Sequence, residues 1–315
     1  MTAINTRAAH AAAVARLTSL NRAADMAQEQ IATGKRLTAP ADDPISFTRA
    51  AVLRRVDTAA TATQRGIDAA SRRLNATDTA LAGISEIVQR ARELALQGSN
   101  GTLSASDRSV LATEVSELLA AATGLADTRG SDGERLFGGA AGAGPAYAAD
   151  ADGVLQWQGA GRAPAVVIDG ANVASGIEGP DAFGLTTTTV AGVPPVTTVT
   201  SRDLFATLSA LVNALAEPDD GRRNTAMTTA LGEIDGHITR LGTARATAGA
   251  RLGRLDSETE RIARSSLANQ TDLTKLESLD LTEGIARLQR LLTVVRAAQA
   301  SFVQTSNLSL WDQLR

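Results

Sequence analysis

The chain has 315 residues, a net charge of −3 at pH 7 and no cysteine, which excludes disulfides, thiolate metal ligands and cysteine nucleophiles. Its pI near 5.6 gives no electrostatic footprint for nucleic acid. The start of the chain lacks the apolar core of a secretory signal peptide, and no apolar run approaches the roughly 18 residues that span a bilayer. We therefore expect neither nucleic acid nor a membrane as a partner.

The first predicted helix is alanine-rich and covers residues 8–33. Leu17, Leu20 and Ile31 lie along one seam of it, at the spacing that keeps apolar side chains on one helix face. Gly34 is the residue type preferred just beyond a helix end, so we expect the helix to stop there.

The second predicted helix carries the longest periodic pattern of the chain. Two prolines in residues 38–44 interrupt the first helix, and Asp42 or Asp43 can cap the next one. From there apolar residues alternate at steps of three and four to about Gln97, a period typical of coiled coils. This seam consists of Leu53, Val56, Ala60, Thr63, Ile67, Ala70, Leu74, Thr77, Leu81, Ile84, Val88, Ala91 and Ala95.

A third, shorter helix follows a break at residues 98–101. Ser104 or Ser106 can cap it, and we expect it to end near Ala126. Its predicted inward side chains are Leu111, Val115, Leu118, Ala122 and Leu125.

Residues 136–202 have a different composition and predict a small β-rich domain inserted between two helical arms. Glycine, proline, threonine and valine dominate this segment. The Asp-Gly pair at 132–133, followed by Leu-Phe, is a hairpin signal. Strands are predicted at residues 154–158, 165–168 and 186–190. The threonines of the last strand could carry O-linked sugars, but strand formation is the favoured explanation for them.

Helical spacing returns at residues 204–215, and a second long seam runs from about Arg223 to beyond Ile262. A last helix is predicted over residues 280–306, and the chain ends in an apolar, aromatic segment. This helix has Ile285, Leu288, Leu292, Val295 and Phe302 at heptad steps, and the end segment contains Leu310 and Trp311. We expect this stripe to be buried only by neighbouring subunits.

The sequence offers little chemistry for catalysis. His10 and His237 are the two histidines, one in each helical arm, and neither lies near a metal-ligand pattern. We interpret both as helix-surface or packing residues. Asp42 and Asp43 are explained by capping rather than by paired acid–base chemistry. We therefore predict no catalytic residue, no metal and no cofactor.

The expected fold class is mainly α: a long antiparallel coiled-coil helical bundle formed by both chain ends, with the small inserted β-rich domain. We divide the chain into three parts. Residues 1–40 with 280–315 form a terminal helical domain, residues 41–135 with 203–279 a long helical bundle domain, and residues 136–202 the inserted outer domain.

Four segments, in chain order, carry a resemblance to a known family. They are residues 31–37 running into 41–44, residues 88–97 followed by 100–104, residues 132–139, and residues 249–255. They resemble the helical signatures of the bacterial flagellin family. Pro44 and the ending at 308–312 are similar to the members that join hook and filament, whereas the start at residues 3–6 is similar to the filament subunit.

The resemblance implies a structural component of the bacterial flagellum, not an enzyme, that forms the junction ring between hook and filament and adapts one to the other. It implies that both chain ends pack into the axial core of the tube, and that the chain is exported by the flagellar type III system to an extracellular position without a cleaved signal peptide. The implied partners are another hook-associated junction protein, flagellin, further copies of this chain in a ring, and an export chaperone. The candidate residues for subunit or chaperone contacts are Leu17, Leu20, Ile31, Ile285, Leu288, Leu292, Val295, Phe302, Leu310 and Trp311.

Two alternatives to the junction role remain at this point. One is flagellin itself, the filament subunit. The other is a cytoplasmic coiled-coil signalling scaffold, which accounts for the heptads but not for the β-rich insertion, the Gly-Lys-Arg turn at 34–36 or the aromatic tail.

Overall fold

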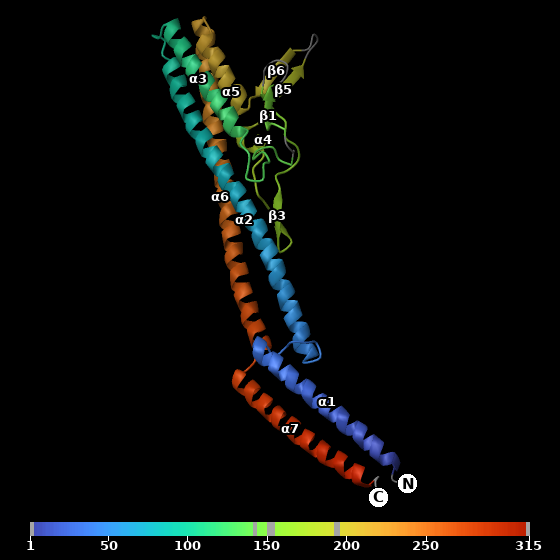
Figure 1. The fold of residues 1–315 in the computed structure, drawn as a ribbon. Coiled ribbons are helices and arrows are strands. Elements are labelled where there is room, and N and C mark those ends of the chain that lie inside the picture. Colours follow the sequence, from blue (N-terminus) through green and yellow to red (C-terminus); the bar gives the residue numbers. More distant parts are fainter. Residues whose placement is uncertain (1–2, 141–143, 150–154, 192–195, 313–315) are drawn as a thin grey trace. The chain divides into compact units, whose positions relative to one another are not determined.

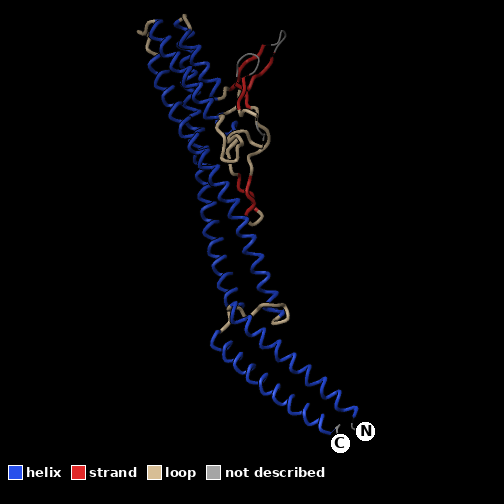
Figure 2. Tube along the Cα trace, viewed as in Figure 1, coloured by secondary structure: helices blue, strands red, loops and turns tan. Residues whose placement is uncertain are grey.

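The structure is a computed structural model that describes residues 3–140, 144–149, 155–191 and 196–312 (Figures 1 and 2). It is mainly helical with a small strand-containing insert, so the predicted fold class is confirmed. The chain forms two compact units: a terminal unit, residues 1–60 with 263–315, and a central unit, residues 61–262. The helices are α1 (Ala3–Thr33), α2 (Pro44–Gly98), α3 (Ala105–Ala126), α4 (Gly179–Phe183), α5 (Leu204–Ala216), α6 (Asp220–Glu277) and α7 (Leu281–Asp312).

The helix starts follow from local capping chemistry. Ser104 caps α3, because its hydroxyl accepts a hydrogen bond from the backbone N–H of Asp107 at 3.1 Å while the Asp107 carboxylate accepts one from the backbone N–H of Ser104 at 3.3 Å. Asp43 caps α2 by accepting from the Ser46 backbone N–H at 3.0 Å. Of the paired candidates in the sequence, Ser104 and Asp43 are therefore the capping residues.

In the central unit, α2 and α6 run antiparallel and present their predicted seams to a shared core. The seam of α2 is buried throughout from Ile67 to Ala95. Polar contacts along the flanks of the two helices fix their register, and include Arg92 to Asp235 at 2.6 Å and Arg245 to Asp78 at 2.9 Å. Arg245 lies at a heptad position of the α6 seam, where apolar residues are expected, and its guanidinium is paired with Asp78 at the edge of the core.

Among the described helices, α3 alone has the length and apolar composition that would suffice to cross a membrane. In the central unit this helix packs along α5. Val115 and Ala122 of α3 are fully buried, and Glu114 pairs with Arg90 of α2 at 2.7 Å. The apolar side chains of α3 are therefore explained by its packing against neighbouring helices of the bundle.

Among its described residues, the insert contains three separate antiparallel hairpins and the short helix α4 (Figure 2). They pair β1 (Tyr147–Ala149) with β2 (Leu155–Trp157), β3 (Ala165–Ile168) with β4 (Ala171–Ala174), and β5 (Thr187–Ala191) with β6 (Val196–Ser201). The three predicted strands are confirmed as β2, β3 and β5. Their partners β1, β4 and β6 were missed, because each is short or lies outside the apolar runs.

The hairpin signal at residues 132–133 corresponds to a short antiparallel turn. Gly133 adopts the left-handed conformation, with φ of 80°, and Arg129 and Arg135 form an antiparallel bridge. The Gly130 N–H donates to the Glu134 carbonyl at 2.8 Å and the Leu136 N–H to the Thr128 carbonyl at 3.0 Å. The pairing does not extend into strands, and the Leu136 and Phe137 side chains are fully buried in the core.

An aromatic cluster anchors the insert to the bundle. The Phe183 ring of α4 lies 4.9 Å from Phe137, 5.9 Å from Tyr147 and 5.5 Å from Phe205 of α5, as measured between ring centroids. The indole N–H of Trp157 donates to the Phe137 carbonyl at 2.9 Å. Five of the eight aromatic residues of the chain thus meet here, which explains how so few can hold an irregular insert.

His237 of α6 is a packing residue buried beside α5. Its side chain is 6% exposed, and Nε2 lies 3.1 Å from the hydroxyl of Thr207, while Nδ1 has no hydrogen-bond partner among the described residues. Burial, reinforced by the nearby charge of Arg240, lowers its pKa to about 4. His10 lies on the surface of α1, with its ring 4.9 Å from that of Phe302.

We predict that Phe183→Ala lowers the free energy of unfolding of the central unit by about 3–5 kcal/mol, because it removes a fully buried ring that contacts three others. Chemical denaturation measures the change. Val167→Ala, at a strand position that is 62% exposed, serves as the control and is expected to change it by about 0.5 kcal/mol or less. A loss below about 1 kcal/mol for Phe183→Ala would contradict this role of the cluster.

The stability of the central unit is predicted to fall as the pH drops from about 6.5 to about 4. A histidine whose folded-state pKa is lowered binds its proton more readily in the unfolded state, so acid favours unfolding across this window by up to about 3 kcal/mol. Denaturant titrations at several pH values measure this slope in the native chain and in His237→Gln. Asp203, whose pKa is raised by burial, makes the folded state more stable as the pH falls. Because both proteins contain Asp203, its effect cancels in the comparison. Equal slopes would contradict the assignment.

Candidate assembly surface

The terminal unit is built on an antiparallel pair of helices, α1 and α7, which places the two ends of the chain close together (Figure 1). His10 meets Phe302 near one end of the pair. Of the candidate interface residues on α1, Leu17, Leu20 and Ile31 are all half-buried. The pair therefore covers part of the predicted stripe within one chain.

The structure divides the predicted stripe of α7 between two faces. Leu288, Val295 and Phe302 lie on the face toward α1, and Val295 is only 7% exposed. Ile285 and Leu292 are 47% and 41% exposed. The expectation that the whole stripe is buried only by neighbouring subunits is therefore wrong for Val295. That the residues of this stripe contact other subunits or a chaperone remains a prediction.

Small residues complete the face toward α1, and the sequence pattern overlooked them because it favours large side chains. Gly284 is buried, and a Cβ there would lie 3.4 Å from Cγ1 of Ile31 and 2.9 Å from Cδ2 of Leu279. Leu291 and Ala298 continue the same face at steps of seven. Helices approach more closely where the side chains between them are small.

Leu310 and Trp311 belong to the last turns of α7. Their side chains lie outside the described residues, so the prediction that they take part in an interface remains untested. The same holds for the aromatic tail as a whole, from residue 305 onward.

Large apolar side chains that are exposed gather on the terminal unit. It holds 11 of the 15 such residues among the described side chains, whereas the connected hydrophobic core lies within residues 67–255. A helix that is apolar on several faces is normally buried, and a contiguous apolar surface marks an interaction site. These eleven residues, which we call the assembly surface, are Val14, Met26, Ile45, Val52, Val56, Leu267, Leu281, Ile285, Leu292, Val294 and Val303.

Two turns of the terminal unit are joined by backbone hydrogen bonds. Gly34 adopts the left-handed conformation, with φ of 68°, and ends α1. The Arg36 backbone N–H then donates to the Glu277 carbonyl at 2.6 Å, and the Leu279 N–H donates to the Gly34 carbonyl at 3.0 Å. The Gly-Lys-Arg segment seen in the sequence thus links the α1–α2 turn to the α6–α7 turn.

Ion pairs reinforce this link. The Glu277 carboxylate pairs with Arg54 and, at 3.4 Å, with Lys35, and its side chain is 13% exposed. Arg36 donates to the Leu276 carbonyl at 2.9 Å and approaches Asp43 at 3.6 Å. An acidic residue at the C-terminal end of a helix is disfavoured by the helix dipole, so Glu277 is held there by these partners.

Asp42 closes the α1–α2 turn from within. Its carboxylate accepts hydrogen bonds from the backbone N–H groups of Ala39 at 2.8 Å and Thr38 at 2.9 Å, and from the Thr38 hydroxyl at 3.0 Å. These bonds, first that from Ala39, lower the pKa of Asp42. The carboxylate therefore stays ionised at neutral pH.

We predict that Glu277→Gln loosens the linked turns by about 1 kcal/mol, since it removes the charge that Lys35 and Arg54 share. Amide hydrogen exchange at Arg36 and Leu279 measures this opening and should accelerate about fivefold. Glu283→Gln, on α7, is the matched control, because Glu283 forms no ion pair among the described residues. Equal exchange in both variants would show that the Glu277 charge does not hold the link.

Comparisons with known proteins fit this geometry. The family described as "Bacterial flagellin N-terminal helical region" matches residues 4–141, and the "Bacterial flagellin C-terminal helical region" matches residues 231–312. Together these matches take in the helical arms and most of the chain. Residues 142–230, which lie between them, include all three hairpins of the insert.

Among curated proteins, the chain is 25% identical to flagellar hook-associated protein 3 of Escherichia coli over 90% of each chain. It is 27% identical to a flagellin of Listeria monocytogenes, over 86% of this chain and 84% of that one. Both kinds of relative therefore extend across nearly the whole sequence.

Solved structures share the fold. A putative flagellar hook-associated protein from Vibrio parahaemolyticus superposes with a TM-score of 0.65 at 20% identity, covering 75% of this chain and all of that one. Flagellar hook-associated protein-3 from Legionella pneumophila gives 0.62 at 16% identity, over 71% and 98%. The chain belongs to the bacterial flagellin family, whose members are non-enzymatic structural proteins that assemble with other components of the bacterial flagellum.

Proposed function

We propose that this chain forms the junction between hook and filament and adapts one to the other. The observation that carries the proposal is the match to flagellar hook-associated protein 3 over 90% of both chains, which includes the insert as well as the arms. The Salmonella typhimurium protein of the same name matches equally far, at 24% identity. Pro44 and the ending at 308–312, which resemble the junction members, support the same assignment.

The assembly surface gives the proposal a physical basis. Eleven exposed large apolar side chains lie on the terminal unit, seven of them on α1 and α7, and require cover from outside the chain. The partners we propose are further copies of the chain in a ring, a second hook-associated protein on one side, and flagellin on the other. Before assembly the same surface is an aggregation hazard, so we also propose that an export chaperone masks it during type III export.

The three-part division made from the sequence is part of this proposal. It ends the terminal domain at the turns, at residues 40 and 280, whereas the two compact units divide inside the long helices, at residues 60 and 262. Limited proteolysis tests the difference, because cleavage at the linked turns supports the sequence-based boundaries and cleavage near residues 60 and 262 contradicts them.

Flagellin is the second candidate, and the 27% identity to a Listeria flagellin supports it. Deletion of the gene separates the two. A junction protein is predicted to leave hooks without filaments while flagellin is secreted into the medium. Loss of the filament subunit itself, with hook-associated proteins still on the hook, would mean that this chain is flagellin.

We predict that Leu292→Asp leaves the isolated chain folded but strongly reduces the number of hooks that carry a filament. Leu292 is 41% exposed, so a charge there keeps access to water in the isolated chain but cannot be buried by a neighbour. Electron microscopy of a complemented deletion strain counts the filaments. Val167→Asp, at an exposed apolar position of the insert, is the control and should assemble normally. Normal filament numbers with Leu292→Asp would contradict the role of this face.

A further inference from the structure

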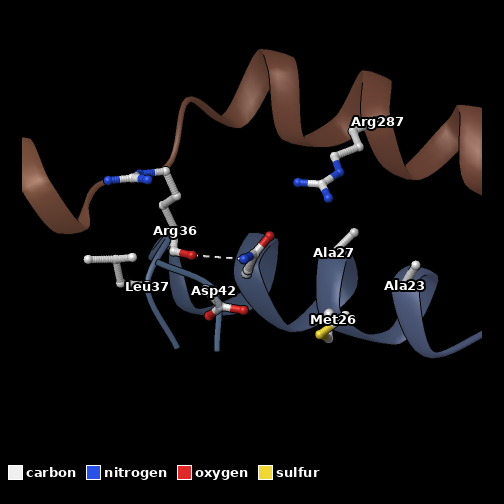
Figure 3. A pocket seen from close by; sticks show the side chains of 8 residues that line it. Ala23, Met26, Ala27, Arg36, Leu37, Asp42 and Arg287 are labelled. Atoms are coloured by element: carbon white, nitrogen blue, oxygen red, sulfur yellow. Dashed lines mark hydrogen bonds between the residues drawn. The ribbon is translucent and has the colours of Figure 1, made fainter. Parts of the chain in front are cut away.

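A cavity of about 280 Å³ lies beside the α1–α2 turn of the terminal unit (Figure 3). Met26 and Leu37 supply apolar walls, and Arg36, Asp42 and Arg287 supply the charged ones. In Figure 3 the Arg287 side chain extends from α7 toward α1. The cavity thus combines a small apolar surface with two guanidinium groups and a carboxylate.

Arg287 is the charge in this cavity that has no direct partner, although it contributes to the lowered pKa of the nearby Asp42. Arg36 is already engaged with the Leu276 carbonyl and with Asp43. Asp42 is held by its three hydrogen bonds from Thr38 and Ala39. Within the part of the chain that the structure describes, Arg287 forms neither an ion pair nor a hydrogen bond. Its guanidinium is therefore available to an anion from outside.

The charge distribution of the chain indicates the source of that anion. The terminal unit has a net charge of +4 and the central unit −7. Exposed acids of the central unit include Glu117 and Asp256, which form no ion pair among the described residues. When copies of such a chain meet, opposite charges steer the terminal unit of one toward the central unit of another.

We propose that the cavity receives a carboxylate side chain from residues 61–262 of a second copy of this chain, with Arg287 as its ion-pair partner. Guanidinium and carboxylate match in planar geometry and form strong, paired hydrogen bonds. Met26 and Leu37 accommodate the methylene stem of an aspartate or glutamate. The Asp42 carboxylate on the wall repels any anion, so the cavity favours a single side-chain carboxylate over a multiply charged free anion. The inference rests on the proposed ring of copies.

Carbodiimide cross-linking of Arg287→Lys tests this contact directly. The variant keeps the positive charge and places an amine in the cavity, and carbodiimide joins an amine only to a carboxylate in contact with it. The chain has just two native lysines, Lys35 and Lys275, so products of the new amine are easily recognised. The reaction is performed on isolated hook–filament structures and read by mass spectrometry.

We expect a covalent dimer of the 32.4 kDa chain, joined between residue 287 and an acid within residues 61–262. Arg296→Lys, on the same helix but outside the cavity, is the matched control, and a covalent dimer joined through residue 296 to an acid within residues 61–262 should be about tenfold less abundant. A bond to Asp42 within one chain alone, or a bond to a different protein, would overturn the inference while leaving the junction role intact. Absence of the chain from the isolated structures would instead contradict the proposed function, and the inference with it.

Discussion

Two helices lying side by side cannot enclose a hydrophobic core, and this constraint governs the terminal unit. Between α1 and α7 the deeply buried apolar residues are few and mostly small, such as Ala24, Ala27 and Val295. The large side chains at Ile285 and Leu292 remain in contact with water. Because each methylene that leaves water contributes about 0.8 kcal/mol, a neighbouring chain that covers these side chains supplies the missing stability.

The central unit, in contrast, has enough elements around its two long helices to enclose a hydrophobic core. It surrounds the seams of α2 and α6 with α3, α5 and the insert, so its core is continuous. The insert is irregular, but its rings meet Phe205 of α5 and fix it to the bundle. One chain therefore combines a part that is complete by itself with a part that is not.

Features that depend on local chemistry were predictable from the sequence. The ends of the helices followed from Gly34, Pro44 and the capping residues, and the long seams followed from their period. The face of α7 that meets α1 was predicted only in part, since Gly284 contributes by being small and a search for large apolar residues passes over it. The role of Glu277 could not be foreseen either, because its partners Lys35 and Arg54 are more than 200 residues away.

Hydrogen exchange on the dilute chain and on the assembled flagellum tests the central claim most directly. If the terminal unit is completed by other subunits, amides of residues 8–33 and 285–306 exchange rapidly in the isolated chain and become strongly protected on assembly, whereas those of the central core are protected in both. Strong protection of residues 8–33 and 285–306 in the dilute chain would contradict the account, because the helical pair would then be stable without a neighbour.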